Sequence, residues 1–432
     1  MPDFQIALPN ELNYSSVLPS LPSGVQSLEQ YLLPVNGSTF NTSVGGTVVQ
    51  WDLPARGFLV PNSMYIRYFY TVTNTTLVSA MLGTPVYAPI QKLETIFGSQ
   101  TVESINNYNQ TMNMVTNLSM NVAQKYGVQN SYGWFNNTST PALDALDGRA
   151  CVLNETGSFS APLFGLLANS ERYLPLGMMP NVRVQITLDK LTNFFQQNNL
   201  VSQESPSQFA ITNFELCFTM LDFGSAVESM VKNMGETIVI KSQSFTNTSN
   251  TISIAGTGYQ ELVFSQRLAS IKSFFLLNPI NGGTTTNGLF DSYDITKGGS
   301  YQIGVGGKYY PQKVLDTTAN KSAIYMELRK AIGAINSNNN NFSINTIEFN
   351  RVVGVATTLI EPAKFFVGVN MELLPDSKNS LLTGTSTQNT PITVRMNIAS
   401  ATASTSASVT LISLYDALIE INPMDRQATV RQ

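Results

Sequence analysis

The chain has 432 residues, with 24 Lys or Arg and 28 Asp or Glu, so its net charge is -4. Charged residues make up 12% and hydrophobic residues 43%, which leaves a polar remainder of mostly neutral Asn, Thr, Ser and Gln. This balance excludes intrinsic disorder, which requires low hydrophobicity and high charge. The absence of histidine excludes a Ser-His-Asp triad and most transition-metal sites. Two cysteines exclude a disulfide framework; Cys151 and Cys217 could form one bridge, but we expect two buried thiols.

Stretches that alternate apolar and polar residues, or that are rich in β-branched and aromatic residues, predict strands along the whole chain. In the first half they cover residues 48–51, 65–73, 93–104, 182–188 and 210–221. In the second half they cover residues 238–240, 301–309, 365–374, 392–398 and 409–421. The predicted fold class is therefore all-β, with few helical insertions.

Two segments have helical periodicity. Residues 322–335 place Ile324, Leu328, Ala331 and Ile332 on one face, with Ser322 as the expected N-cap. A weaker, Asn-rich pattern covers residues 105–125, where Met112, Val115, Leu118 and Val122 recur at spacings of three and four. Each segment follows a predicted strand that carries glycine.

The order of these elements repeats. In each half, a Gly-containing strand leads into a helix, and further strands separated by a Leu-rich loop follow. We therefore predict two tandem eight-stranded jelly-roll β-sandwiches. The expected division is an N-terminal arm at residues 1–37, a first jelly roll at 38–230 and a second at 231–432. Apolar residues such as Phe4 and Leu18, interrupted by prolines, predict that the arm packs on its own or a neighbouring subunit.

The sequence offers no set of residues for catalysis, cofactor binding or metal binding, so we expect a protein that is not an enzyme. The glycine-rich residues 304–308 lack the spacing of a phosphate-binding loop, so we interpret them as a bend or bulge in a strand. Two Asp pairs, Asp144 with Asp147 and Asp291 with Asp294, are interpreted as solvated turn residues.

Trp51 is expected in the core, and Trp134 is the one candidate platform for a sugar. The first residues show no secretory signal, so we expect synthesis without export.

The organisation resembles the double jelly-roll major capsid proteins of tailless icosahedral DNA viruses. Residues 159–163, Phe-Ser-Ala-Pro-Leu, followed by Leu-Pro-Leu-Gly at 174–177 and the strand from Val182, look like the F–G region of that family. The strands at residues 47–53 and 65–73 are similar to its first B and C strands. The repeat with helix-bearing insertions in both halves is the third point of resemblance.

The resemblance implies a structural protein of the virion, synthesised and assembled inside the host cell. It implies a homotrimer that forms a pseudo-hexagonal capsomer and contacts neighbouring capsomers, penton proteins and minor capsid proteins. Many family members enclose an internal membrane. The chain has no basic arm, so no sequence-specific nucleic-acid binding is expected. The alternative function is a β-sandwich glycan-binding or fibre-type attachment protein.

Overall fold

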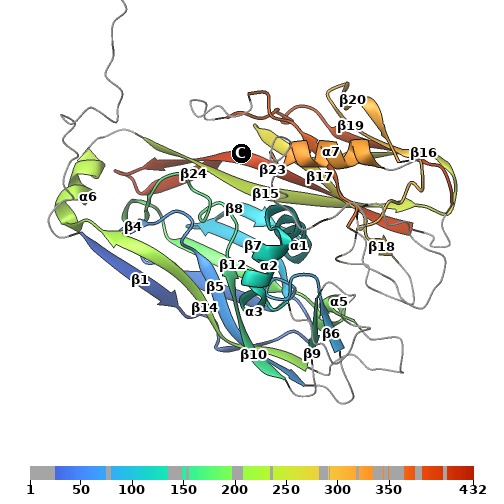
Figure 1. Ribbon diagram of the computed structural model, residues 1–432. Coiled ribbons are helices and arrows are strands. Elements are labelled where there is room, and N and C mark those ends of the chain that lie inside the picture. The colour runs from blue at the N-terminus through green and yellow to red at the C-terminus, as the bar shows by residue number, and fades with distance from the viewer. Residues whose placement is uncertain are drawn as a thin grey trace, which may run out of the picture.

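The structure is a computed structural model, shown in Figure 1. It describes residues 25–73, 79–134, 148–151, 155–196, 208–233, 237–281, 290, 292–317, 321–333, 344, 349, 364–374, 382–401 and 406–432. Residues 1–24 of the predicted arm lie outside these ranges, and so do Asp144, Asp147 and Asp291.

The first half of the chain contains two main antiparallel sheets and a small third one. Its strands are β1 (Gln26–Leu32), β2 (Thr39–Asn41), β3 (Val48–Asp52), β4 (Phe58–Leu59), β5 (Tyr65–Thr73), β6 (Ser79–Leu82), β7 (Ile90–Phe97), β8 (Gln100–Ile105), β9 (Gly148–Cys151), β10 (Thr156–Pro162), β11 (Leu174–Pro175), β12 (Val182–Leu188), β13 (Phe195–Gln196) and β14 (Gln208–Asp222). Its helices are α1 (Tyr108–Ser119), α2 (Val122–Gly127), α3 (Gln129–Tyr132) and α5 (Leu191–Phe194).

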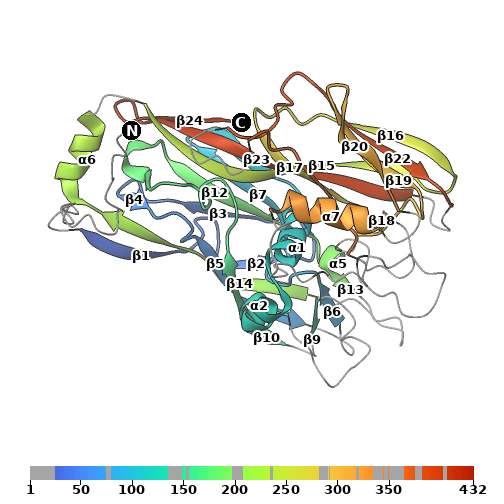
Figure 2. The same ribbon diagram turned by 45° about the horizontal axis from the view of Figure 1, so that its top comes forward.

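The second half begins after α6 (Gly224–Asn233), which connects β14 to β15 at one end of the molecule (Figures 1 and 2). Its strands are β15 (Ile238–Ser253), β16 (Gly258–Phe264), β17 (Ile271–Leu277), β18 (Ile280–Asn281), β19 (Ser300–Val305), β20 (Lys308–Asp316), β21 (Val367–Asn370), β22 (Ile392–Ile398), β23 (Ser406–Asn422) and β24 (Gln427–Arg431). Helix α7 (Ser322–Ala331) packs on β21.

The two halves share one pattern of strand pairing. One sheet of the first half has the order β3-β12-β7-β8, and its counterpart in the second half has the order β16-β22-β19-β20. The facing sheet contains β10-β5-β14 with β1 and β2 on the far side of β14; in the second half it is β21-β17-β23 with β15 on the far side of β23. A helix follows the last strand of each four-stranded sheet. This equivalence confirms the predicted repeat and the all-β double jelly-roll fold.

Alternating burial explains why the sequence forms these strands. In β12 the residues from Val182 to Leu188 alternate between buried and half-buried, and β22 repeats that pattern. Each strand can therefore present one face to the core and one to the outside. β12 has the predicted bounds, because the alternation is not interrupted within it.

Two predicted strands are wrong in the same way. Residues 93–104 and 301–309 were each expected to form one strand, but each region forms a hairpin, β7–β8 and β19–β20. Gly98, Gly306 and Gly307 have positive φ, the backbone conformation that two-residue hairpin turns require. The glycine-rich residues 304–308 are therefore a hairpin turn with its flanking strand residues, and not a bend in a continuous strand.

The helix predictions need two corrections. The pattern at residues 105–125 is split, since α1 ends at Ser119 and Asn121 caps α2 through Gln124. Val122 is consequently 54% exposed and does not continue the apolar face of Met112 and Leu118. Ser322 is the first residue of α7 and not its N-cap; that position belongs to Lys321, whose φ is 54°.

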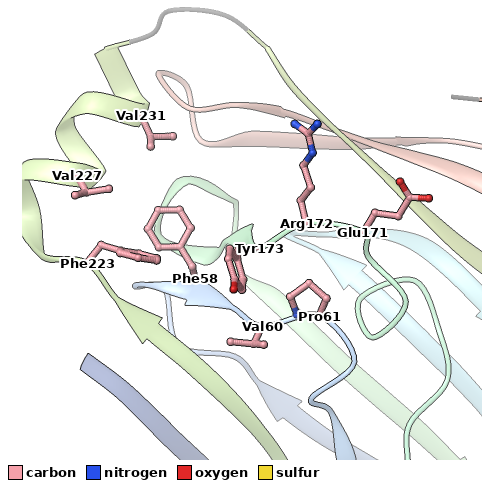
Figure 3. Close-up of a pocket in the computed structure, with 9 residues that line it drawn as sticks. All are labelled: Phe58, Val60, Pro61, Glu171, Arg172, Tyr173, Phe223, Val227 and Val231. Carbon is pink, nitrogen blue, oxygen red and sulfur yellow. The ribbon is translucent and has the colours of Figure 1, made fainter. Parts of the chain in front are cut away.

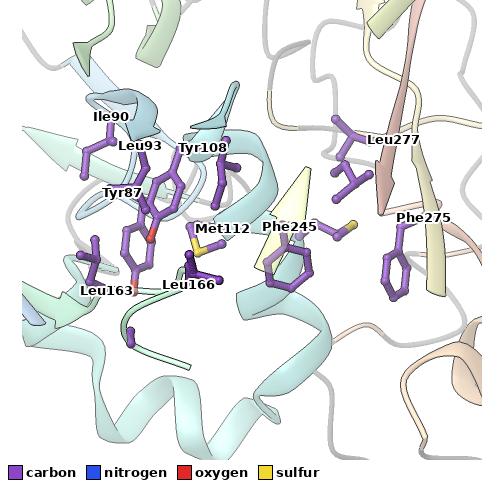
Figure 4. Packing of buried hydrophobic residues seen from close by; sticks show 14 of the residues in the cluster. Tyr87, Ile90, Leu93, Tyr108, Met112, Leu163, Leu166, Phe245, Phe275 and Leu277 are labelled. Carbon is purple, nitrogen blue, oxygen red and sulfur yellow. The ribbon is translucent and has the colours of Figure 1, made fainter. Parts of the chain in front are cut away.

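The hydrophobic core is continuous through both halves. Trp51 is fully buried, as predicted, and packs edge-on against Phe214, with their ring centres 5.0 Å apart. In the view of Figure 4, Phe245 of β15 lies between Met112 of α1 and Phe275 of β17. The packing between the halves is therefore part of the same core that fills each sandwich.

Candidate functional site

The two halves meet at a buried polar cluster around the Glu103 carboxylate. Glu103 lies on β8 and is 2% exposed. Its Oε2 accepts a hydrogen bond from Thr95 Oγ1 at 2.7 Å, and its Oε1 accepts one from the Leu166 backbone N–H at 2.7 Å. Ser244 Oγ of β15, in the second half, donates to the same Oε1. This carboxylate thus binds three donors that come from both halves.

Burial sets the electrostatics of this cluster. Removing the Glu103 carboxylate from water raises its pKa above the usual value, and the hydrogen bonds from Ser244, Thr95 and Leu166 oppose that rise. Because its carboxylate oxygens accept from Thr95, the Leu166 N–H and Ser244, Glu103 joins β8 to β15.

Further hydrogen bonds connect the same two surfaces. Asn247 on β15 donates to the backbone oxygen of Asn106 and to Thr111 Oγ1, the latter at 2.9 Å. Ser242 Oγ donates to the Leu166 oxygen at 2.5 Å, and Asn169 donates to the Gln243 oxygen at 3.1 Å. These bonds leave β15 with little freedom to move relative to the first sandwich. The relative orientation of the two halves is therefore fixed by polar contacts as well as by the core.

Asp294 is not the solvated turn residue that the sequence predicted. It is 3% exposed and accepts hydrogen bonds from Thr296 Oγ1 at 2.6 Å and from Tyr301 at 3.3 Å. Its Oδ2 also lies 3.2 Å from the Lys321 ammonium, which is itself 6% exposed and 5.0 Å from the Phe365 ring centre. The pair anchors the start of α7 to the segment before β19, so its role is structural.

The sugar platform that Trp134 could have provided is not open to solvent. Trp134 is 9% exposed, and its ring centre lies 5.3 Å from the ring centre of Tyr132. The Lys125 ammonium lies 5.1 Å from the centre of the Trp134 ring. Two arginines form ion pairs with neighbouring carboxylates: Arg67 with Glu215 and Arg183 with Asp52. Cys217 is a buried free thiol, whereas the side chain of Cys151 lies outside the described residues.

A mostly apolar hollow of about 590 Å³ lies beside α6, the connection between the halves. Figure 3 shows Val227 and Val231 of α6 facing it from one side, with Phe58, Tyr173 and Phe223 next to them and Arg172 and Glu171 on the opposite side. The rings of Phe223 and Phe58 pack edge-on, with their centres 5.2 Å apart. The sequence did not predict that these residues line one hollow, because they come from three separate segments, residues 58–61, 171–173 and 223–231.

Catalytic and metal-binding constellations are not evident in the part of the chain that the structure describes. There, no three His, Cys, Asp or Glu residues come together in a way that could hold a metal ion. Within the same residues, no helix has the length and apolarity needed to cross a membrane. Glu103 and Lys321 were not predicted as buried residues. β8 reads Gln-Thr-Val-Glu-Ser-Ile, and in such a mostly polar strand nothing distinguishes Glu103 from an exposed residue.

The chain matches no protein-family model and no curated protein. It is similar to solved structures over nearly its whole length. It superposes on the capsid protein in the PBCV-1 virus capsid with a TM-score of 0.60 and 13% identity, covering 97% of this chain and 99% of that one. For the Faustovirus major capsid protein the TM-score is 0.61, with 8% identity and coverage of 95% and 92%. For the mavirus major capsid protein the TM-score is 0.53, with 11% identity and coverage of 99% and 95%. The chain therefore has the double jelly-roll fold found in these viral proteins.

Proposed function

We propose that this chain is a structural major capsid protein that forms pseudo-hexagonal trimeric capsomers of an icosahedral virus shell, and that its place is in the virion. The observation that carries this proposal is the full-length match of both sandwiches, in one chain, to the capsid proteins of PBCV-1, Faustovirus and mavirus. Two like sandwiches in each of three subunits give six similar units around one axis, which is the geometry of a pseudo-hexagon.

The contacts between the halves support this role. A pseudo-hexagonal capsomer needs the two sandwiches of each subunit at a constant orientation, because neighbouring capsomers meet both. Glu103, Asn247 and the shared core provide such a constraint within a single chain. A non-enzymatic role fits the same observations, since the buried carboxylates at Glu103 and Asp294 are satisfied by structural partners.

For the division of the chain we propose an arm at residues 1–37, a first jelly roll at 38–230 and a second at 231–432. Within the described residues, the strands from β1 to β14 pair only with one another, and so do those from β15 to β24. The proposed arm is anchored at its C-terminal end, where Gln26–Leu32 pairs antiparallel with β14 of the same chain.

The proposed partners are two further copies of the chain, neighbouring capsomers, and the penton and minor capsid proteins of the shell; an internal membrane is a further proposed neighbour. The neutral polar composition supports such contacts, because Asn, Gln and Thr can be buried between subunits without the desolvation cost of charges. The alternative of a glycan-binding attachment protein loses its one candidate platform with the burial of Trp134.

The decisive experiment is to determine the mass of the purified protein by light scattering and to image it by electron microscopy. We expect trimers with a pseudo-hexagonal outline, and shells when the other capsid proteins are present. A chain that stays monomeric at high concentration, with no particles in any image, would contradict the proposal.

A further inference from the structure

We propose that the hollow beside α6 is the docking site for the N-terminal segment of the same chain, with Leu18 and Leu21 as the side chains that enter it. This inference concerns contacts within one chain, so it does not depend on the proposed capsid function.

The first reason is the place where the described chain begins. β1 starts at Gln26, which pairs with Asp222, and Asp222 directly precedes Phe223 in the lining of the hollow. The described chain therefore begins next to this surface. Leu21 is five residues from Gln26, a distance of about 15 Å in an extended chain. The segment is thus held at a high effective concentration near the hollow, as a short tether does.

The second reason is the chemistry of the hollow. Val227 and Val231 are the apolar face of α6, and both are only half-buried. Phe58, Phe223 and Tyr173 add three aromatic rings, and the Tyr173 side chain is 48% exposed. A volume of about 590 Å³ can accommodate a few apolar side chains, whereas Arg172 and Glu171 provide a polar boundary on one side.

The third reason is the sequence of the segment. Residues 17–22 read Val-Leu-Pro-Ser-Leu-Pro, and the residue before each proline is restricted to extended conformations. In a polyproline II helix, which has three residues per turn, Leu18 and Leu21 lie on the same side. Proline-rich segments of this kind bind aromatic-lined grooves, because little conformational entropy is lost when they dock.

Docking would also cover the connection between the two sandwiches. α6 carries the chain from β14 to β15, and its Val227 and Val231 line the hollow. A segment that fills the hollow would bury Val227 and Val231 and hold α6 against Phe58.

The test is a disulfide between the segment and α6 in the full-length chain. Leu21→Cys is combined with Val231→Cys, which lines the hollow, or with Met230→Cys, which is adjacent on α6 but 67% exposed. After mild oxidation, mass spectrometry of the linked peptides identifies each pair. We expect severalfold more intrachain link to residue 231 than to residue 230. Equal yields at the two positions would overturn the proposal.

Two further measurements distinguish the occupant. When chains carrying only Leu21→Cys are mixed with chains carrying only Val231→Cys, we expect little link between chains; a link that forms mainly there would assign the hollow to the segment of a neighbouring copy and overturn docking within one chain. Leu18→Asp, added to the Leu21→Cys and Val231→Cys pair, should lower the yield to that of the Met230 control, and Leu18→Ile should not. An unchanged yield with Leu18→Asp would also contradict the proposal.

Discussion

Ser244 of β15 donates a hydrogen bond to the Glu103 carboxylate of β8, and this bond joins the two sandwiches of the chain. The two residues are 141 positions apart, and each lies on a strand of a different half. Because both are buried, neither can exchange its partner for water without opening the junction. The pair is therefore a sensitive point at which to test how the halves are held together.

Replacing Glu103 by Leu should destabilise the chain. The change leaves the Leu166 N–H and the Ser244 and Thr95 hydroxyls without their acceptor, and each buried unsatisfied donor costs about 1–3 kcal/mol. Glu103→Gln keeps an oxygen for Leu166 and is the matched control. We expect a clearly lower denaturant midpoint for the Leu variant and a nearly unchanged one for the Gln variant. Equal loss in both variants would mean that charge and not hydrogen bonding stabilises the junction.

The Glu103→Gln variant also tests how the stability of the fold depends on pH. Because burial raises the pKa of Glu103, the folded chain keeps this proton to a higher pH than the unfolded chain does. The stability that protonated Glu103 contributes is complete below the ordinary glutamate pKa of about 4.3 and is lost as the pH rises through the higher folded value. Glu103→Gln cannot show this loss. We therefore expect the melting temperature of Glu103→Gln minus that of the original chain to increase with pH across this window. A difference that does not change with pH would contradict the prediction.

The sequence predicted the strands and the repeat well, because both depend on local alternation. β12 and β22 have an uninterrupted period of two, so their faces and bounds follow from the residues themselves. The hairpins at Gly98 and Gly306 were missed, because a turn of two residues hardly disturbs the apolar pattern on either side. The break after Ser119 in the first helix was missed for a similar reason, since Asn121 recreates a helix start at once.

The junction could not be predicted from the sequence. β8 does not alternate, since the neighbours Val102 and Glu103 are both buried, and its residues do not reveal that it meets β15 or that Ser244 lies opposite Glu103. The ion pair of Asp294 with Lys321 is hidden in the same way, because both residues are in loop-like segments where charge normally means exposure. Long-range partners of polar residues are set by tertiary packing, which a single sequence does not contain.

The buried ion pair gives a third prediction. Asp294→Asn keeps an oxygen that can accept from Thr296 and Tyr301, but it leaves the Lys321 ammonium buried without a counter-charge. Breaking a buried pair in this way costs about 3–5 kcal/mol. The double variant Asp294→Asn with Lys321→Met removes both charges and keeps the acceptor for Thr296 and Tyr301, so it should recover most of that loss in a thermal unfolding measurement. A double variant no more stable than Asp294→Asn would show that the uncompensated Lys321 ammonium is not the cause of the loss.

Gly368 of β21 lies directly against α7. A Cβ at this position would lie 2.7 Å from Leu328 Cδ1 and 3.0 Å from the Leu328 Cα, so the helix would have to move. We expect Gly368→Ala to lower the unfolding free energy by about 1–3 kcal/mol, as overpacking does. The matched control is Gly256→Ala, where a Cβ would meet nothing within 4 Å. Similar melting temperatures for the two variants would show that α7 yields without cost.

Cys217 should resist thiol reagents as long as the chain is folded. Its side chain is 1% exposed, and burial raises the pKa of the thiol to about 11. At pH 8 only roughly a thousandth of the thiol would be the reactive thiolate, against about a quarter for an unperturbed cysteine with a pKa near 8.5. We therefore expect peptide mapping after iodoacetamide treatment to find Cys217 unmodified in the native protein and fully modified in guanidinium. The residual rate in the native protein should increase about tenfold with each pH unit above 8, because the thiolate fraction grows until the pH approaches 11. Rapid native modification at pH 8, or a rate that levels off near pH 8.5, would mean that Cys217 is accessible and that β14 opens locally at this position.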